Sequence, residues 1–299
     1  MFASDSHRNI VELRNEISSL KEDINNFQVQ QILTYASQNE EFANNYKDEL
    51  KYIKVYGMTP FPYENVRQLG EVEGGYEKGM PYVIHKNKKL FFPKTWNLSY
   101  ARQTYRNYIE NENLLGGGFK RVAPHRYQTD DFCVEEGDIV IDLGCAEALF
   151  ALDSVEKAGK VVVVESDVQW IDALKATFEP YGDKCRIVNR IVSGIDSTDS
   201  ITLKTMLENE GDSPVFLKMD IEGYEYETLV GSSDFLRARH NMKIACCTYH
   251  KSNDAERIST LLASLGYKCE FSEGSMLFPY DIREFCAPYF RKGLVRAEK

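Results

Sequence analysis

Residues 139–148, with the sequence IVIDLGCAEA, decide the fold of this chain. An apolar run of strand length leads into a tight turn that holds one glycine, Gly144, between the acids Asp142 and Glu147. The segment that follows, to about Lys157, has the length of a helix. Glycine in such a turn lets the backbone approach a neighbour or a ligand closely. The stretch therefore predicts a strand, a turn and a helix in immediate succession.

The same alternation continues to the end of the chain. Further apolar runs, separated mostly by helix-length segments, are KVVVVES (160–166), CRIVNRIV (185–192), VFLKMDIE (215–222), KIACCTYH (243–250), YKCEF (267–271) and GLVRAEK (293–299). Strands that alternate with helices favour a mostly parallel sheet with helices on both faces. We therefore expect an α/β domain over residues 120–299.

The chain before residue 120 follows a different pattern. Pro60 and Pro62 end regular helix, because proline removes a donor and clashes in a helix interior. Residues 1–59 are therefore expected to form an N-terminal helical segment. Residues 60–119 are expected to form an extension or lid, made of a hairpin and a helix.

The predicted hairpin and helix have clear signals. Residues 82–85 and 90–92 are apolar and flank a polar, turn-prone stretch, as in a β-hairpin. Residues 96–109 are typical of a helix, and three consecutive glycines at 116–118 end it.

The N-terminal segment also carries one narrow apolar stripe. Its members are three and four residues apart, which is the seam spacing of a short coiled coil; they are Ile10, Leu13, Ile17, Leu20, Ile24 and Phe27. The stripe covers less than three heptads and stops before Gln31. It would bind either a second copy of the chain, giving a homo-oligomer, or another part of the same chain.

Composition excludes several classes of protein. The 299 residues carry a formal net charge of −10, which repels a polyphosphate backbone, so nucleic acid is not expected as a partner. The seven cysteines contain no Cys-x-x-Cys pair, which argues against a disulfide framework and a zinc site. No apolar run has the length of a membrane span, and the start has no signal-peptide pattern. We expect a cytoplasmic protein.

The ends of the predicted strands hold the candidate binding residues, because open parallel sheets bind ligands at the carboxyl ends of their strands. Glu165 ends the second strand and could accept hydrogen bonds from both hydroxyls of a ribose. A dinucleotide would require a three-glycine loop for its pyrophosphate. The turn here has one glycine, and Asp142 and Glu147 would instead attract the sulfonium and ammonium groups of S-adenosylmethionine.

A second motif, KMDIEGYE at residues 218–225, follows the strand that begins at Val215. It places three acids around one glycine, and strand alternation would put Lys218, Asp220 and Glu222 on one face. Crowded acids are costly unless a cationic group lies nearby, so the motif favours a functional site.

With both motifs in view, the sequence resembles the FkbM-type methyltransferases, whose marks are a D-x-G-A-n-x-G turn and a strand that ends K-x-D-x-E-G-x-E. The second mark is present in full, and the resemblance covers about residues 120–299. It extends to Tyr249-His250-Lys251, to Asp254 and, more loosely, to the segment PHRY at 124–127. The chain departs from the first mark at Ala148, where the family usually has glycine.

The resemblance implies a fold, a cofactor and an acceptor. The fold would be the class I methyltransferase (Rossmann-like) sheet of seven mostly parallel strands, and the cofactor S-adenosyl-L-methionine. Typical acceptors are hydroxyls of sugars or natural products. By position, the methionine part would lie at Asp142, Gly144 and Cys145, the ribose at Glu165, and the transferred methyl near Asp220. Ser166 and Asp167 would flank the adenosine.

Transfer of a methyl group to an alcohol needs a base that removes the hydroxyl proton. His250, expected at the end of the fifth strand, has a suitable reference pKa. Asp220 and Glu222 are rival bases, and either could instead hold a divalent metal with His250, although a metal is not favoured. His125 and Arg126 are candidate acceptor-binding residues, as is Tyr249.

The predicted function is therefore S-adenosylmethionine-dependent O-methylation of a sugar or polysaccharide-precursor hydroxyl. Two alternatives stay open at this point. One is a nicotinamide-dependent oxidoreductase on a similar sheet. The other is a non-catalytic scaffold with a degenerate cofactor site, in which the N-terminal stripe recruits a partner.

Overall fold

The computed structural model describes residues 2–119 and 123–299, which form two compact units. The first unit contains the chain up to Glu64 together with Met276–Phe290, and the second contains Asn65–Ser275 and Arg291–Lys299. Residues 65–119, expected as an extension or lid, thus lie in the same unit as the predicted α/β domain. Among the described residues, no helix is both long and apolar enough to cross a bilayer.

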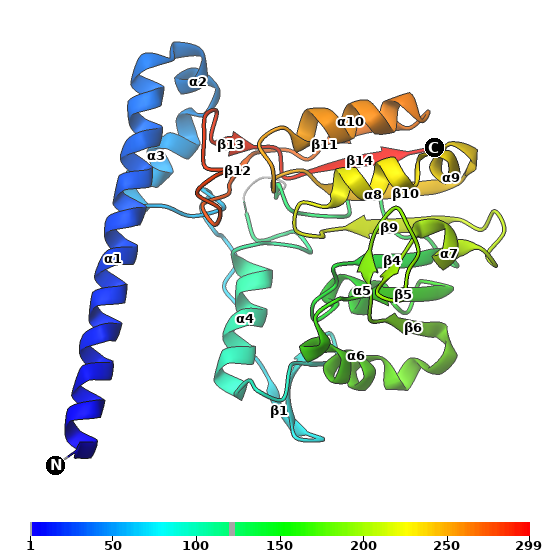
Figure 1. Ribbon diagram of the computed structural model, residues 1–299, viewed down its shortest axis with the longest axis horizontal. Coiled ribbons are helices and arrows are strands. Elements are labelled where there is room, and N and C mark those ends of the chain that lie inside the picture. The colour runs from blue at the N-terminus through cyan, green and yellow to red at the C-terminus, as the bar shows by residue number, and fades with distance from the viewer. Residues whose placement is uncertain (1, 120–122) are drawn as a thin grey trace. The chain divides into compact units, whose positions relative to one another are not determined.

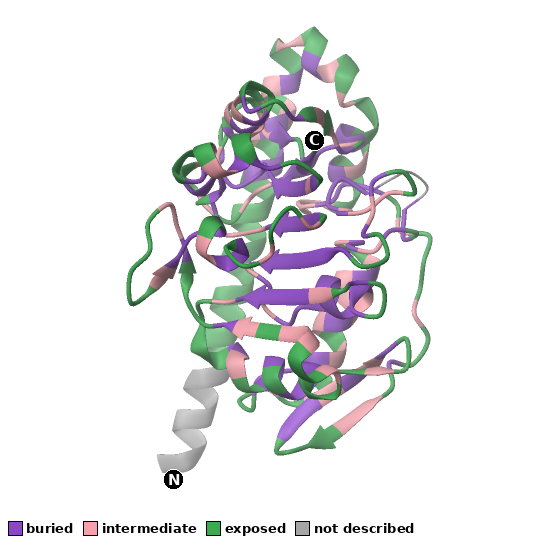
Figure 2. Cartoon of the chain, turned by 90° about the vertical axis from the view of Figure 1, so that its right-hand side faces the viewer, coloured by how far each residue is buried: buried purple, intermediate pink, exposed green. Residues whose placement is uncertain are grey.

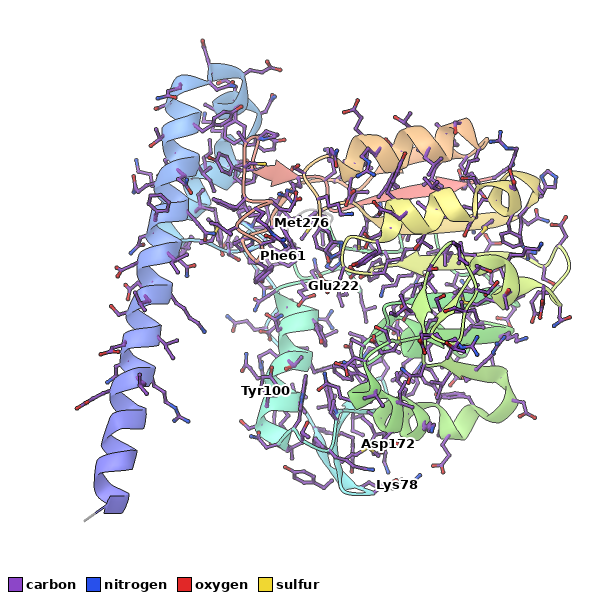
Figure 3. The ribbon with its side chains drawn as sticks, in the orientation of Figure 1. Phe61, Lys78, Tyr100, Asp172, Glu222 and Met276 are labelled. Atoms are coloured by element: carbon purple, nitrogen blue, oxygen red, sulfur yellow. The ribbon has the colours of Figure 1, made fainter. Side chains whose placement is uncertain are left out.

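The first unit is helical. It contains α1 (Phe2–Gln38), α2 (Glu40–Asn45) and α3 (Lys47–Tyr56), with a short ribbon of β12 (Met276–Leu277) and β13 (Phe290–Arg291). Its small core consists of Ile32, Ala36, Phe42, Leu50, Ile53, Leu277, Phe285 and Phe290. Asn39 begins α2 by accepting a hydrogen bond from the Phe42 amide, as an N-cap residue does. The Leu277 amide donates to the Pro60 carbonyl, which brings the neighbouring Phe61 and Met276 together (Figure 3).

The second unit is built on a seven-stranded sheet (Figure 1). Its strands, in spatial order, are β11 (Lys268–Phe271), β14 (Leu294–Glu298), β10 (Met242–Cys247), β9 (Val215–Met219), β4 (Ile139–Leu143), β5 (Lys160–Val164) and β6 (Cys185–Val188). Only β14 runs antiparallel to its neighbours in this sheet. The chain leaves β4 toward β5 on one side and later returns on the other side as β9, so strand order reverses between them. This arrangement confirms the expected class I methyltransferase fold.

The central strands are buried on both faces, as Figure 2 shows in purple, because helices cover the sheet. One face packs against side chains from α7 (Leu203–Leu207), α8 (Glu225–Gly231), α9 (Ser233–Ala238) and α10 (Asp254–Ser264). The other face includes Phe216, whose ring lies 5.5 Å from that of Phe150 in α5 (Leu149–Ser154). The α/β part of this unit also contains η1 (Val168–Trp170), α6 (Ile171–Phe178), η2 (Glu179–Lys184), β7 (Ile191–Val192) and β8 (Ser200–Ile201).

Two expected elements are divided in the structure. The run CRIVNRIV forms β6 and then the separate β7, which pairs with β8 outside the main sheet. The helix expected over residues 224–239 is two helices, α8 and α9, with Ser232 between them. Apolar periodicity did not reveal either break, because both parts of each run face the core.

The predicted hairpin is present and gains a third strand. β1 (Gly74–Glu77), β2 (Met80–His85) and β3 (Lys88–Phe91) form an antiparallel sheet, and α4 (Leu98–Glu110) follows it. Met80 and Phe91 pack against Ala173 and Ala176 of α6, and the Phe91 amide donates to Thr177 Oγ1. These contacts fix the three-stranded sheet to the edge of the α/β core.

Candidate functional site

A cavity of about 510 Å³ opens at the carboxyl ends of the central strands. Its walls come from the loops that follow β4, β5, β6 and β9, on both sides of the point where strand order reverses. This is where open α/β sheets bind ligands. The lining residues are Gly144, Ala146, Val164, Glu165, Ser166, Asp167, Trp170, Arg190, Ile191, Val192, Asp220, Ile221, Glu222 and Tyr224.

The turn after β4 depends on Gly144. Its φ of +65° lies in the left-handed region, and a Cβ there would stand 1.8 Å from the Asp220 carbonyl oxygen. No side chain can be accommodated at that distance, so only glycine lets the turn pass the end of β9. The close approach also explains why the two sequence motifs belong together: the first turn rests on the second.

Ala148 departs from the family pattern in its backbone conformation as well as its size. In the structure Ala148 is the residue before α5 and has φ +63°, a left-handed conformation that disfavours alanine relative to glycine. The substitution therefore stores local strain at the start of α5, and Ala148 does not line the cavity.

Glu165 occupies the position expected for a ribose-binding acid. One carboxylate oxygen accepts a hydrogen bond from the Ala146 amide at 2.9 Å, and the other accepts one from the Asp167 amide at 2.8 Å. These bonds fix the carboxylate at the cavity wall while each oxygen keeps a further lone pair. The Asp167 side chain in turn accepts a hydrogen bond from the Gln169 amide and caps the start of the 3-10 helix η1, so it has a structural partner.

Asp142 does not face the cavity as an unpaired acid. It is almost fully buried, and its Oδ1 lies 3.0 Å from Lys218 Nζ. Lys218 also donates to the carbonyls of Leu143 and Gly144. Burial disfavours the Lys218 ammonium, but Asp142 and Asp220 outweigh this and raise its pKa. Asp142 therefore already has a cationic partner, and its predicted attraction for the cofactor stays a prediction.

Cys145 and Glu147 are likewise buried and lie outside the cavity lining. Burial raises the pKa of Glu147 to about 7, against a hydrogen bond from Tyr108 that lowers it. Burial also raises the pKa of Glu112 to about 8, and Glu147 and Asp220 add to the rise. The raised pKa values of Glu147 and Glu112 favour their protonated forms near neutral pH, which reduces the negative charge that the sequence predicted for this region.

Asp220 is the centre of the hydrogen-bond network at the end of β9. Its Oδ2 accepts from the Tyr127 hydroxyl at 2.9 Å, and its Oδ1 accepts from the Tyr249 hydroxyl at 3.0 Å. His125 Nε2 lies 3.3 Å from Oδ2. Burial would raise the pKa of Asp220, but His125, Lys218 and His250 together hold it well below its usual range. Asp220 therefore remains ionised.

His250 lies beside this network, past the end of β10. Its Nδ1 is 3.1 Å from Glu225 Oε1, and Glu225 is completely buried. Its Nε2 is 3.6 Å from both Asp220 Oδ1 and Glu222 Oε2. Burial opposes the imidazolium, but Glu225, Asp220 and Glu222 outweigh it and raise the pKa of His250. The imidazole thus has one nitrogen toward a fixed buried carboxylate and the other toward the acids of the cavity.

Glu222 does not continue the strand pattern as expected. β9 ends at Met219, and Glu222 adopts φ +57° and Gly223 φ +89°, so the chain turns sharply there. The Glu222 side chain, labelled in Figure 3, is 86% exposed and lines the cavity. Alternation therefore does not align Lys218, Asp220 and Glu222 on one face, although Glu222 still reaches His250.

Two groups of described residues have the composition of a metal site: His125, Asp220 and Cys247, and Asp220, Glu225 and His250. Both groups share Asp220, whose two oxygens already accept hydrogen bonds from tyrosine hydroxyls. Burial raises the pKa of Cys247 well above its ordinary value, which disfavours the thiolate that a metal would need. The donors present suit a hydrogen-bond network better than a metal centre.

The candidate acceptor-binding residues separate in the structure. His125 and Tyr249 both contact Asp220. Arg126 instead has its guanidinium within 4 Å of the exposed Asp130, and the Arg126 carbonyl accepts a hydrogen bond from Arg296. Arg126 is thus turned from the Asp220 network.

Sequence reasoning missed several residues of the site. Trp170, Arg190, Ile191, Val192 and Tyr224 line the cavity, and Tyr127 and Glu225 hold Asp220 and His250. Glu225 had a signal, since it is the last acid of the 218–225 motif. Tyr224 lies in the same motif and Tyr127 in the PHRY segment, but neither was singled out. Trp170, Arg190, Ile191 and Val192 had no signal, because their places at the cavity depend on the packing of distant segments.

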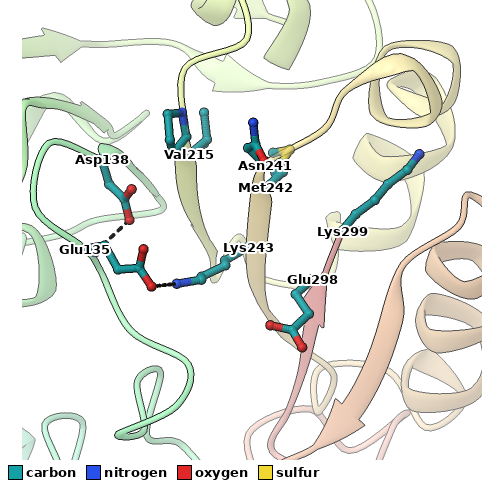
Figure 4. A pocket seen from close by; sticks show the side chains of 9 residues that line it. Glu135, Asp138, Val215, Asn241, Met242, Lys243, Glu298 and Lys299 are labelled. Atoms are coloured by element: carbon teal, nitrogen blue, oxygen red, sulfur yellow. Dashed lines mark hydrogen bonds and ion pairs between the residues drawn. The ribbon is translucent and has the colours of Figure 1, made fainter.

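A second cavity, of about 300 Å³, lies at the opposite edge of the sheet (Figure 4). It is lined by the amino ends of β9 and β10 and by the end of the antiparallel β14, including Lys243, Glu298 and Lys299. Lys243 Nζ donates to Glu135 and to the Cys133 carbonyl. The lining also contains the buried Asp138, whose carboxylate accepts a hydrogen bond from the Glu135 amide.

Comparison with known proteins agrees with the fold. Residues 116–269, about half of the chain, match the methyltransferase FkbM domain family. The class of protein is thus a methyltransferase, and the chain belongs to the FkbM methyltransferase domain family. No curated protein matches the sequence significantly.

Solved structures resemble the chain only distantly. A precorrin-6y C5,15-methyltransferase from Geobacter metallireducens is 12% identical with a TM-score of 0.37, covering 55% of this chain and 81% of its own. A putative transferase from Pyrococcus horikoshii is 11% identical with a TM-score of 0.39, covering 74% and 71%. Magnesium protoporphyrin IX methyltransferase from Synechocystis, with S-adenosylmethionine bound, is 13% identical with a TM-score of 0.35, covering 55% and 71%. Similarity this low identifies no acceptor.

Proposed function

We propose that the protein is an S-adenosylmethionine-dependent O-methyltransferase that acts on a hydroxyl of a sugar or polysaccharide precursor. The observation that carries the proposal is the position of His250, held between the buried Glu225 and the ionised Asp220 at the edge of the cavity. An imidazole in this setting can remove a proton from a hydroxyl group. Membership of a methyltransferase family supports the group that is transferred.

The cavity suits the nucleoside part of the cofactor. Glu165 would accept hydrogen bonds from the ribose hydroxyls, and the Gly144 turn leaves space because no Cβ is present there. Trp170, Ile191 and Val192 would provide apolar contact for the adenine. When bound, S-adenosylmethionine supplies a methyl group on a positively charged sulfur. Asp220, kept ionised by its donors, would favour that positive charge at the cavity wall.

His250 is the preferred base among the three candidates. Its Nδ1 faces Glu225, so Nε2 is the atom available to accept the proton of the acceptor hydroxyl. Asp220 is a poor base because its pKa is held well below the usual range. Glu222 is 86% exposed, so water competes with the acceptor hydroxyl for its carboxylate. Glu225 would act as a positioning residue that fixes the imidazole and favours the proton it receives.

A neutral polyhydroxylated acceptor fits the side chains near His250. Asp220 and Glu222 line the cavity beside His250, and the buried Tyr127, Tyr249 and His125 contact Asp220 and would be reached by a sugar only through that carboxylate. A sugar can exchange hydrogen bonds with such a set, whereas a phosphate or carboxylate would meet the charge of Asp220 and Glu222. These side chains support the sugar hydroxyl as the acceptor class.

Calorimetry tests the cofactor assignment. S-Adenosylhomocysteine should bind the wild-type protein, and NAD should not, because the turn has no three-glycine loop. Glu165→Gln should weaken S-adenosylhomocysteine binding roughly 10-fold or more, since removing the charge weakens charge-assisted hydrogen bonds to the ribose. Glu210→Gln, in an acid paired with Lys160 away from the cavity, is the control and should bind normally. Binding of NAD alone would disprove the cofactor assignment, and binding of neither compound would favour a non-catalytic scaffold.

Labelled methyl transfer to a panel of nucleotide sugars and glycans tests the reaction. His250→Ala should bind S-adenosylhomocysteine as the wild type does and lose roughly 100-fold or more of its turnover. Wild-type activity should fall as the pH decreases through the raised His250 pKa, because the protonated imidazole cannot accept a proton. In Glu225→Gln this decrease should move to lower pH, since the variant removes a charge that raises the pKa.

Two results would contradict this mechanism. Full turnover in His250→Ala would remove His250 as the base. Loss of wild-type activity with a chelator, restored by a divalent cation, would assign Asp220, Glu225 or His250 to a metal site instead.

A further inference from the structure

Residues 13–27 form an exposed stretch of α1. All sixteen residues from 12 to 27 are exposed, and burial begins only at Gln28 and Val29. The apolar residues of this stretch are between 52% and 62% exposed; they are Leu13, Ile17, Leu20, Ile24 and Phe27. A helix gains most of its stability in proteins from packing an apolar face. These five apolar residues, which we call the α1 seam together with Ile10, therefore form a surface that needs a partner.

The residue types along the α1 seam indicate a second copy of the same chain. If Ile10 is assigned position a of a heptad, Ile17 and Ile24 also fall at a, whereas Leu13 and Leu20 fall at d. Isoleucine at a with leucine at d favours two-stranded, parallel coiled coils, because the two side-chain shapes fill the different packing geometries at these positions.

The charges beside the seam are self-complementary in the same arrangement. The e positions hold Arg14 and Lys21, and the g positions hold Glu16 and Asp23. In a parallel, in-register pair, a g residue faces the e residue of the next heptad in the partner. Glu16 then faces the partner's Lys21, and the reciprocal pair forms by symmetry. An antiparallel pair would bring e against e and g against g, which are like charges.

We propose that two copies of this protein associate through residues 10–27 of α1 as a parallel, in-register coiled coil. The contact spans less than three heptads, so the dimer is reversible, with a dissociation constant in the roughly micromolar range expected of a small interface. The seam ends where Gln31 occupies the next a position. The interaction needs no residue of the methyltransferase cavity.

Sedimentation equilibrium of the full-length chain tests the seam. The wild type should be a monomer–dimer equilibrium. Leu20→Glu should weaken it roughly 100-fold or more, because two charges would be buried face to face. Ser19→Glu, on the neighbouring exposed c position, adds the same charge outside the seam and should leave the equilibrium unchanged. S-Adenosylhomocysteine binding should be unaltered in both variants, since the interface needs no residue of the cavity, and the circular dichroism of Ser19→Glu should match that of the wild type because residue 19 is exposed.

Charge reversal tests the orientation. Glu16→Lys should weaken its homodimer roughly 10-fold, because both symmetric pairs become repulsive, and Lys21→Glu should do the same. Mixed in equal amounts, the two variants should restore wild-type affinity. In the heterodimer, position 16 of each chain again faces a charge of opposite sign at position 21 of the other chain.

Each outcome bears on the proposal. A wild-type chain that stays monomeric at about 200 µM, well above the micromolar range expected of a small interface, would overturn the seam as the interface. A dimer unaffected by Leu20→Glu would do the same. Weakened variants that are not rescued by mixing would overturn the parallel register. A complex that contains another protein and excludes a second copy would replace the homodimer by a heterotypic partner.

Discussion

The two ends of the methyltransferase sheet each carry a cavity, but they hold their charged groups differently. At the carboxyl end, Asp142, Lys218 and Glu225 are almost fully buried, and each is fixed by a specific partner. At the amino end, Lys243 pairs with the exposed Glu135 (Figure 4). A buried charge constrains its neighbours because water cannot replace a lost partner, whereas water readily replaces a lost surface pair. The difference predicts that equivalent substitutions have unequal costs at the two ends.

The largest contrast should come from glycine. Gly144→Ala should destabilise the protein by about 5 kcal/mol or more, or prevent folding, because its Cβ would overlap the Asp220 carbonyl. Gly137→Ala is the matched substitution near the amino end: its φ is +86°, and a Cβ there meets nothing within 4 Å. It should cost about 1–2 kcal/mol from backbone conformation alone. Denaturant unfolding measures both values, and equal costs would show that the turn can shift away from β9.

Loss of a lysine should give the next largest difference. Lys218→Met should cost about 3–4 kcal/mol, since it leaves the buried Asp142 without its counter-charge. Lys243→Met removes a cation from an exposed pair and should cost less than about 1 kcal/mol. Urea unfolding at neutral pH compares the two. A small loss for Lys218→Met would mean that Asp142 takes up a proton at little cost, and the double variant Lys218→Met with Asp142→Asn would then regain nothing.

The smallest effect should come from replacing a residue other than glycine whose backbone is left-handed. Ala148→Gly should stabilise the protein by about 0.5 kcal/mol, because relief of strain exceeds the lost methyl contact and the added chain entropy. Asn241, at φ +55° just before β10, is the counterpart at the amino end. Asparagine tolerates this conformation, so Asn241→Gly should bring no gain. Thermal unfolding of both variants measures these changes in stability. A clear loss of stability in Ala148→Gly would show that packing of the methyl group outweighs the backbone strain.

The sequence predicted much of the fold because its signals are local. Seven apolar runs separated mainly by helix-length segments indicated the sheet, and the hairpin at 82–92 was equally clear. The division of CRIVNRIV into β6 and β7 escaped prediction, since apolar content does not say which sheet a strand joins. The domain boundaries expected at residues 59 and 119, and the roles of the site residues, remain predictions.

The site was only partly accessible to sequence reasoning. Glu165 and Asp220 do line the cavity, because strand ends can be recognised along the chain. Asp142 was expected to attract a cation from the cofactor, but it lies opposite Lys218 in the register of β4 and β9 and pairs with it. A pattern of acids reveals that charge is concentrated, but which acid is neutralised depends on a neighbour from another strand.

By itself, the sequence determined the order of strands along the chain, the glycine turn, the acids that cluster after β9 and the apolar seam of α1. These follow from periodicity and spacing, which act over a few residues. Tertiary structure alone decided that Lys218 pairs with Asp142, that His125, Lys218 and His250 keep Asp220 ionised, and that Glu225 lies against His250. Most of these contacts join residues far apart in the sequence, and an ionisation state depends on such neighbours in space because charge interactions are set by distance and burial.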